Sequence, residues 1–141
     1  MELLKRENVR ICKGAEDWQD AIRKSIELLE KHGYVEPRYK EEVIGNVKKL
    51  GPYILIADNI ALPHARPEQG AIRTQVAVTL FRDPVAFENG ESAQLFVTLA
   101  AADANKHIDA LVVISELLAE ESYVEQIVAS ATEDELYQYF A

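Results

Sequence analysis

Hydrophobic positions recur with helical spacing in the first third of the chain. Within residues 16–32, apolar side chains return every three or four positions and charged side chains fill the other face. This pattern predicts a helix that ends before Gly33, a residue type that suits the left-handed end of a helix. A second helix is predicted from about Pro37, a favoured first-turn residue, to Gly51. Its apolar face carries Tyr39, Val43, Val47 and Leu50.

The middle of the chain changes to short apolar runs rich in strand-forming residues. They predict strands at 53–57, 60–62, 74–81 and 94–101, with a short edge strand at 85–87. The nearly continuous apolar character of the longer runs indicates a sheet that is covered on both faces.

The helical pattern returns at the end of the chain. A helix is predicted over 106–119, with Asp103 or Asn105 as its cap. Two sequences that begin with Ser122 and Thr132 match the capping box and predict short helices that end near 130 and 140. Helices before and after a run of strands predict an α/β fold, with a mixed β-sheet sandwiched between helices in a single domain.

Composition narrows the class of protein. A length of 141 residues fits one domain, and 48% apolar with 28% charged residues is ordinary for a globular protein. The net charge of −9 argues against nucleic acid and anionic membranes as partners. A single cysteine, Cys12, excludes an internal disulfide, and no apolar run approaches the roughly 20 residues that span a bilayer. The amino-terminal residues lack the apolar core of a secretory signal, so we expect a cytoplasmic protein.

Candidate chemistry lies with the histidines. His32, beside Gly33 at a helix end, is expected to be a solvent-exposed residue. His64 follows a short strand and stands between two prolines, which restrict the backbone on both sides. His107 lies near a predicted helix start, where free backbone N–H groups favour an anion. For both His64 and His107, an ordinary loop or packing role and a functional role stay open on local sequence alone.

Together, two neutral histidines, an arginine and a helix start suit phosphoryl transfer. His64 could attack a phosphoryl group as a nucleophile, while His107, backbone N–H groups and Arg66 hold the phosphoryl oxygens. A zinc site that uses His64 and His107 is the weaker alternative, because zinc sites take three or four protein ligands. Hydrolase and nucleotide-binding motifs are absent from the sequence.

The segment 59–68, NIALPHARPE, resembles the phosphorylation-site motif of the mannitol/fructose-type enzyme IIA domains of the bacterial phosphoenolpyruvate:sugar phosphotransferase system. The segments 33–39, 51–53, 99–101 and 106–108 also match, so the resemblance covers nearly the whole chain, 1–141. The string from Ala61 to Glu68 is most similar to the ascorbate-type branch.

This resemblance implies a phosphocarrier. His64 would accept a phosphoryl group on Nε2 from the histidine phosphocarrier protein and pass it to a cognate IIB component for sugar uptake, without a cofactor. His107 would hydrogen-bond the phosphoryl group. No arginine matches the family's upstream arginine; Arg66 is the substitute candidate for phosphate binding, and Lys48 a second one. Leu62 and Ala65 are either docking contacts or core residues.

Two alternatives accompany this reading. In the first, the chain is a regulatory IIA-like module that signals through the phosphorylation state of His64. In the second, it is a metal-binding protein. The sequence leaves the transported sugar and the oligomeric state open.

Overall fold

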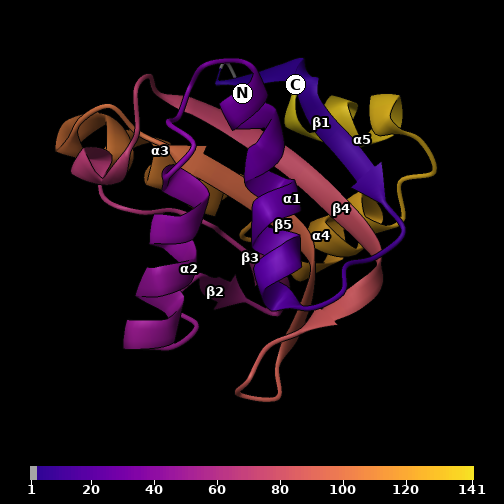
Figure 1. Cartoon of the computed structure of the whole chain (residues 1–141). Helices are drawn as coiled ribbons and strands as arrows, with labels where there is room; N and C mark the ends of the chain where they lie inside the picture. Colours follow the sequence, from indigo (N-terminus) through magenta and orange to yellow (C-terminus); the bar gives the residue numbers. More distant parts are fainter. Residues whose placement is uncertain (1–2) are drawn as a thin grey trace.

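A five-stranded mixed sheet lies at the centre of the computed structural model, which describes residues 3–141 (Figure 1). Its strand order is β1-β4-β5-β3-β2. The β1–β4 and β3–β5 pairs are parallel, whereas β4–β5 and β2–β3 are antiparallel. The strands are β1 (Leu4–Cys12), β2 (Leu55–Ala57), β3 (Asn59–Ala61), β4 (Gln75–Ala86) and β5 (Ser92–Ala100).

Helices cover both faces of this sheet. One apolar core lies between the sheet and α1 and α2, and a second lies between the opposite face and the three carboxyl-terminal helices. The helices are α1 (Trp18–Lys31), α2 (Tyr39–Leu50), α3 (Ala104–Leu117), α4 (Glu121–Val128) and α5 (Glu133–Phe140), with a 3-10 turn at Pro67–Gln69. The predicted α/β fold with a mixed sheet between helices is confirmed.

Both amino-terminal helices end at a glycine, as predicted. Gly33 and Gly51 have φ values of 80° and 84°, a region that side chains other than glycine rarely adopt. Each helix begins about two residues later than its pattern predicted; α1 is capped by the Asp17 side chain, which accepts from the backbone N–H of Asp20.

The sequence pattern did not predict β1. This strand lies at one edge of the sheet and carries Lys5, Arg6 and Glu7 in succession on exposed positions, which interrupts the alternation typical of a half-buried strand. Its buried residues, Leu4, Asn8 and Val9, are too few to form a periodic signal. The residues of β1 are therefore extended because they pair with β4, and local propensity does not account for the strand.

The separate edge strand predicted at 85–87 is wrong. β4 runs without interruption to Ala86, because Val85 and Ala86 continue the ladder opposite Ala93 and Ser92 of β5. The register shifts between Leu80 and Val85, and Pro84 lies within that irregular stretch, where a missing N–H is tolerated.

Capping differs between the last two helices. Thr132 accepts a hydrogen bond from the backbone N–H of Glu135 at 3.1 Å and caps α5, as predicted. Ser122 lies inside α4, whose cap position is occupied by Glu120 without a side-chain hydrogen bond, so the predicted cap there is wrong. Asp103 caps α3, and Asn105 is helical.

This difference yields a stability test. We expect Thr132→Ala to lower the free energy of unfolding by about 1 kcal/mol, because an orphan N–H of α5 loses its acceptor. Ser122→Ala is the matched control and should change stability by less than about 0.5 kcal/mol. Urea unfolding followed by circular dichroism measures both, and equal losses would contradict the assignment of the two caps.

Candidate functional site

The parallel pairing of β3 with β5 determines where the two candidate histidines lie. Because they are parallel, both strands have their carboxyl ends at the same end of the sheet. The loop that carries His64 follows β3, and α3, which carries His107, follows β5. Carboxyl ends of parallel strands are common positions for functional sites. The imidazole rings lie 5.3 Å apart between centroids, with an interplanar angle of 49°.

A hydrogen bond to the backbone holds the ring of His64 and leaves one ring nitrogen, Nε2, free. Its Nδ1 lies 2.6 Å from the carbonyl oxygen of Leu62. Because a carbonyl can only accept, Nδ1 carries the proton and the lone pair remains on Nε2. Burial lowers the pKa of His64, the hydrogen bond to Leu62 opposes this shift, and the proximity of His107 lowers the pKa further. The ring is therefore neutral near neutral pH, and the lone pair on Nε2 is able to act as a nucleophile.

His107 presents a second neutral ring. It lies in the first turn of α3, where its backbone N–H donates to Asp103, and burial lowers its pKa. Its Nδ1 is buried and has no hydrogen-bond partner among residues 3–141. The positive end of the α3 dipole lies at the same place and favours an anion beside the ring.

The two rings share a hollow of about 400 Å³. Residues from α2, the turn before β2, the His64 loop and α3 line it: Asn46, Leu50, Tyr53, His64, Ala65, Arg66, Pro67, Ala104, His107 and Ile108. The sequence pattern assigned Tyr53 to a strand and did not single out Asn46. Spacing on α2 was the only available signal for Asn46, because it lies one turn before Leu50 on the same face.

Arg66 borders this hollow but is already paired. Its Nε donates to Glu68 at 2.8 Å, and both side chains are about two-thirds exposed. The backbone N–H of Arg66 donates to Gln69, whose side chain also contacts Asn46 and Glu42 of α2. The positive charge of Arg66 thus lies near the histidines, on a loop that is hydrogen-bonded to α2 through Gln69.

A family model described as "Phosphoenolpyruvate-dependent sugar phosphotransferase system, EIIA 2" matches residues 2–141. The chain belongs to this family. It is 38% identical over 130 residues to a mannitol-specific cryptic phosphotransferase enzyme IIA component of Escherichia coli (strain K12), covering 92% of this chain and 88% of that protein. It is 34% identical over 137 residues to an ascorbate-specific PTS system EIIA component of Shigella boydii serotype 4 (strain Sb227), covering 95% and 89%.

One solved structure similar to this EIIA chain contains a partner. It is the NMR structure of a complex of enzyme IIAMTL and phosphorylated enzyme IIBMTL from Escherichia coli, with a TM-score of 0.83 and 28% identity over 96% of this chain and 95% of that one. The resemblance to the mannitol/fructose-type family, with ascorbate-type relatives, is confirmed. An EIIA component is a phosphotransferase component, as predicted.

The structure also places four other residues that the sequence singled out. Lys48 is exposed on α2 and does not line the hollow. Leu62 and Ala65 are both buried, as the core alternative predicted, and Ala65 also lines the hollow. His32 is half-buried at the end of α1, where its Nδ1 hydrogen-bonds the side chain of Asn8 instead of facing solvent.

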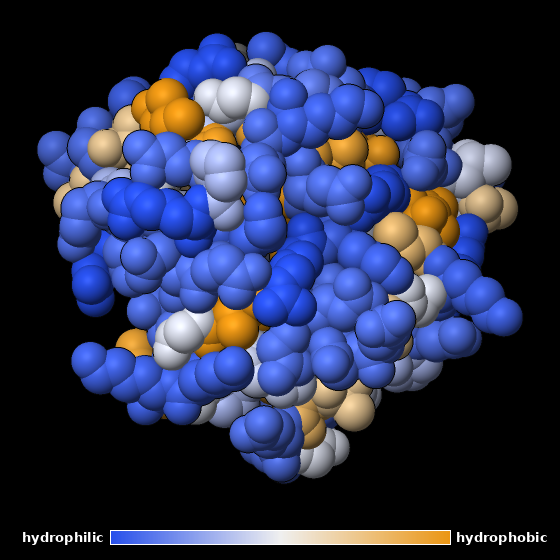
Figure 2. Space-filling view, viewed as in Figure 1, coloured by the Kyte–Doolittle hydropathy of each residue, from blue (hydrophilic) through white to orange (hydrophobic). Residues whose placement is uncertain are grey.

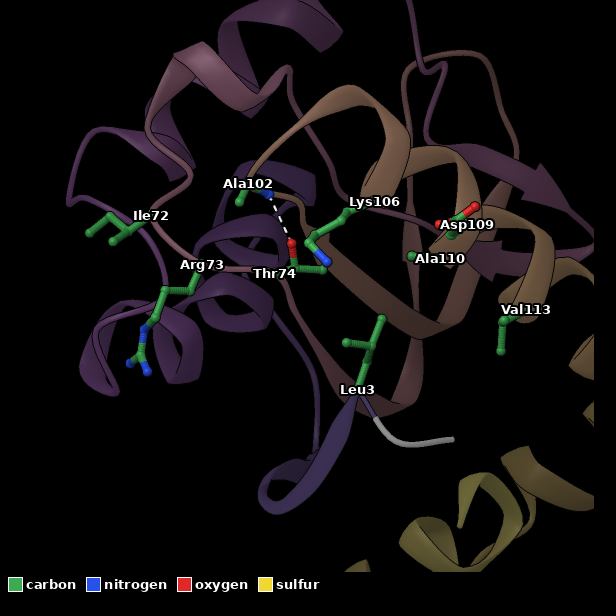
Figure 3. Close-up of a pocket in the computed structure, with 9 residues that line it drawn as sticks. All are labelled: Leu3, Ile72, Arg73, Thr74, Ala102, Lys106, Asp109, Ala110 and Val113. Carbon is green, nitrogen blue, oxygen red and sulfur yellow. Dashed lines mark hydrogen bonds between the residues drawn. The ribbon is translucent and has the colours of Figure 1, made fainter.

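A second hollow, of about 520 Å³, lies along α3 (Figure 3). Lys106 reaches over Thr74, whose hydroxyl accepts from the backbone N–H of Ala102, and Arg73 points away from them. None of the residues that line it is a histidine, cysteine or serine. This larger hollow has no counterpart to the two neutral histidines, and the His64 hollow is the better candidate.

Neither metal-like clusters nor spanning helices are found in the described part of the EIIA chain. Over residues 3–141, no group of three or more histidine, cysteine, aspartate or glutamate side chains is placed to hold a metal ion. Within the same residues, every helix is too short or too polar to cross a bilayer.

The two lowered histidine pKa values give a titration test. We expect the ring of His64 to titrate below the ordinary value of about 6.5, because burial disfavours its charged form. In His107→Gln, the positive charge that His107 gains when it is protonated in acid is removed, which should move the His64 midpoint upward. Ring carbon and proton NMR shifts measured against pH report both values. A wild-type midpoint at or above about 6.5 would contradict the burial argument.

Proposed function

We propose that this EIIA chain, as one domain over 1–141, is a phosphocarrier that accepts a phosphoryl group on Nε2 of His64 and passes it to a IIB component. One observation carries the proposal. The Nδ1–H of His64 donates to the Leu62 carbonyl, so that the free lone pair is on Nε2 in a hollow shared with a second neutral histidine.

The accepting step needs no proton transfer. The Nε2 lone pair of His64 attacks the phosphorus of a phosphohistidine on the donor protein, an N–P bond forms, and the donor's N–P bond breaks with its electron pair returning to the donor ring. The His64 ring keeps its Nδ1 proton and gains positive charge, which the Leu62 carbonyl stabilises at 2.6 Å. Attack by a nucleophile of the IIB component reverses these changes.

Three groups are available for the phosphoryl oxygens. The free ring N–H of His107 can donate, the first turn of α3 contributes its positive dipole end, and Arg66 contributes a full charge after leaving Glu68. The transition state of phosphoryl transfer is loose, so positioning and charge stabilisation supply the catalysis.

The rim of the hollow suits a transient protein partner. Leu50 and Ile108 line the hollow and are 66% and 59% exposed, and Val112 continues this apolar strip along α3. The face of the protein shown in Figure 2 is largely hydrophilic, with small separate apolar patches. A phosphohistidine carrier protein as donor and a IIB component as acceptor would dock in turn on this apolar strip beside the hollow.

The related Escherichia coli complex with phosphorylated enzyme IIBMTL supports a IIB acceptor. A cytoplasmic location is part of the proposal, because the relay begins with phosphoenolpyruvate, a metabolite of the cell interior. The two relatives carry different sugar names, mannitol and ascorbate, so the proposal assigns no sugar.

Labelling tests the role of each histidine. Incubation with phosphoenolpyruvate, the first enzyme of the system and its carrier protein should label the wild type, and His64→Ala should take no label. His107→Ala should still accept phosphate, about 10²-fold more slowly, because one donor to the phosphoryl group is lost. His32→Ala is the control and should behave as the wild type.

Two results would contradict these roles. Labelling of His64→Ala at the wild-type rate would show that another residue is the acceptor. Indifference of His107→Ala in both accepting and donating would make His107 structural. Label that stays on His64 with every IIB component offered would instead support the regulatory alternative.

The ion pair of Arg66 allows a test in both directions. We expect Arg66→Gln to slow phosphoryl transfer roughly three- to tenfold, because the phosphoryl group loses an exposed positive partner. Glu68→Gln should preserve or raise the rate, because it frees the guanidinium from its carboxylate. Arg23→Gln breaks the exposed pair with Glu41 and is the charge-matched control. Rapid-quench kinetics with the labelled carrier protein measure all three, and equal rates for Arg66→Gln and Arg23→Gln would remove Arg66 from the site.

A further inference from the structure

The peptide group between His64 and Ala65 is held on both of its polar atoms by tyrosine hydroxyls. The hydroxyl of Tyr53 donates to the carbonyl oxygen of His64. The hydroxyl of Tyr39 accepts from the backbone N–H of Ala65 at 3.0 Å. A single peptide unit is thus fixed from two elements, the turn before β2 and the helix α2.

Tyr39 also ties this peptide to the sheet. Its hydroxyl donates to the carbonyl oxygen of Leu99 in β5 at 2.8 Å, so both its donor and its acceptor capacities are used. The backbone N–H of the same Leu99 donates to Pro63 at 3.0 Å. The residues on either side of His64 are therefore anchored to one position of a central strand, and Tyr39 is fully buried.

Tyr53 contacts the ring of His64 as well as its backbone. The two ring centroids lie 5.0 Å apart with an interplanar angle of 82°, an edge-on arrangement within the range that stabilises aromatic pairs. Burial raises the pKa of both Tyr53 and Tyr39, so both hydroxyls stay protonated at neutral pH. The position of His64 therefore has three constraints: the hydrogen bond from Nδ1 to Leu62, the contact of its ring with the Tyr53 ring, and the hydrogen bonds on its own peptide.

We propose that Tyr53 and Tyr39 are positioning residues that hold the His64–Ala65 peptide, so that Nδ1 of His64 stays on the Leu62 carbonyl and Nε2 stays free. The proposal rests on the proposed function for its kinetic consequence, but the ring geometry exists without a partner protein. Neither tyrosine transfers a proton or contacts the reacting phosphorus. Each acts through the orientation of His64.

The test removes one hydroxyl at a time and keeps each ring. Tyr53→Phe should raise the population of the tautomer that is protonated on Nε2 and lower kcat for phosphoryl transfer by roughly 10- to 100-fold, because small misplacements of a nucleophile cost about this much. KM for the carrier protein should change by less than about twofold, because binding is not affected. Ring nitrogen NMR shifts of the unphosphorylated protein measure the tautomer, and rapid-quench kinetics measure kcat and KM.

The chain offers a matched control. The hydroxyl of Tyr123 in α4 donates to the carbonyl oxygen of Tyr139 in α5 at 2.6 Å, a part-buried bond of the same kind, packed in the core on the opposite face of the sheet. Tyr123→Phe should lose that bond and leave the His64 tautomer and kcat unchanged. Tyr39→Phe should resemble Tyr53→Phe, and the double variant should lose less than the product of the two single losses, because both hydroxyls hold one peptide.

Each outcome supports or overturns the positioning role. Wild-type tautomer and kcat in Tyr53→Phe overturn it, even if Tyr39→Phe fails to fold. A raised KM with unchanged kcat makes Tyr53 a partner contact, and an equal loss in Tyr123→Phe makes the effect a general loss of stability; both results overturn it. Should the wild type accept no phosphate, the proposed function fails, while the tautomer comparison still decides the positioning role.

Discussion

The parallel pairing of β3 with β5 is the constraint on which the site depends. β3 is only three residues long, and a strand of that length has little stability of its own. Its position is determined by neighbours. At the start of the pair, the side-chain amide of Asn59 donates to the side-chain oxygen of Gln94 and accepts from the backbone N–H of Gln94. Asn59 has a φ of 65°, a conformation that asparagine adopts more readily than most residues, and it turns the chain sharply from β2 into β3.

This pairing brings the two candidate histidines together. The chain leaves β3 into a stiff loop with His64 between two prolines, and it leaves β5 into a helix capped by Asp103. The carboxyl ends of β3 and β5 lie at the same end of the sheet, so two histidines that are 43 positions apart in the sequence come into ring contact. The sheet therefore does more than support the core: it determines the distance between two reactive groups.

The sequence predicted the two histidines and the arginine of the candidate site, but not the tyrosines that hold the His64 peptide. His64 and His107 were found because their neighbours are distinctive: prolines on both sides of one, and a helix start before the other. Helical spacing predicted α1 and α2 because their apolar faces are continuous, whereas the charged residues of β1 concealed a strand. Tyr39 and Tyr53 had the pattern of ordinary core and strand residues. Their hydroxyl partners are backbone groups 11 to 60 positions away, and no local pattern contains that information.

Both borders of the sheet have a consequence for how the protein behaves at high concentration. One border is β1 with its run of exposed charges, and the other is β2, with three residues. Neither offers the long, flat, apolar edge onto which a strand from another chain adds. A carrier must meet many molecules briefly and leave each of them. These two edge strands protect it from aggregation through backbone pairing, while the apolar strip on α2 and α3 stays open to side-chain contacts.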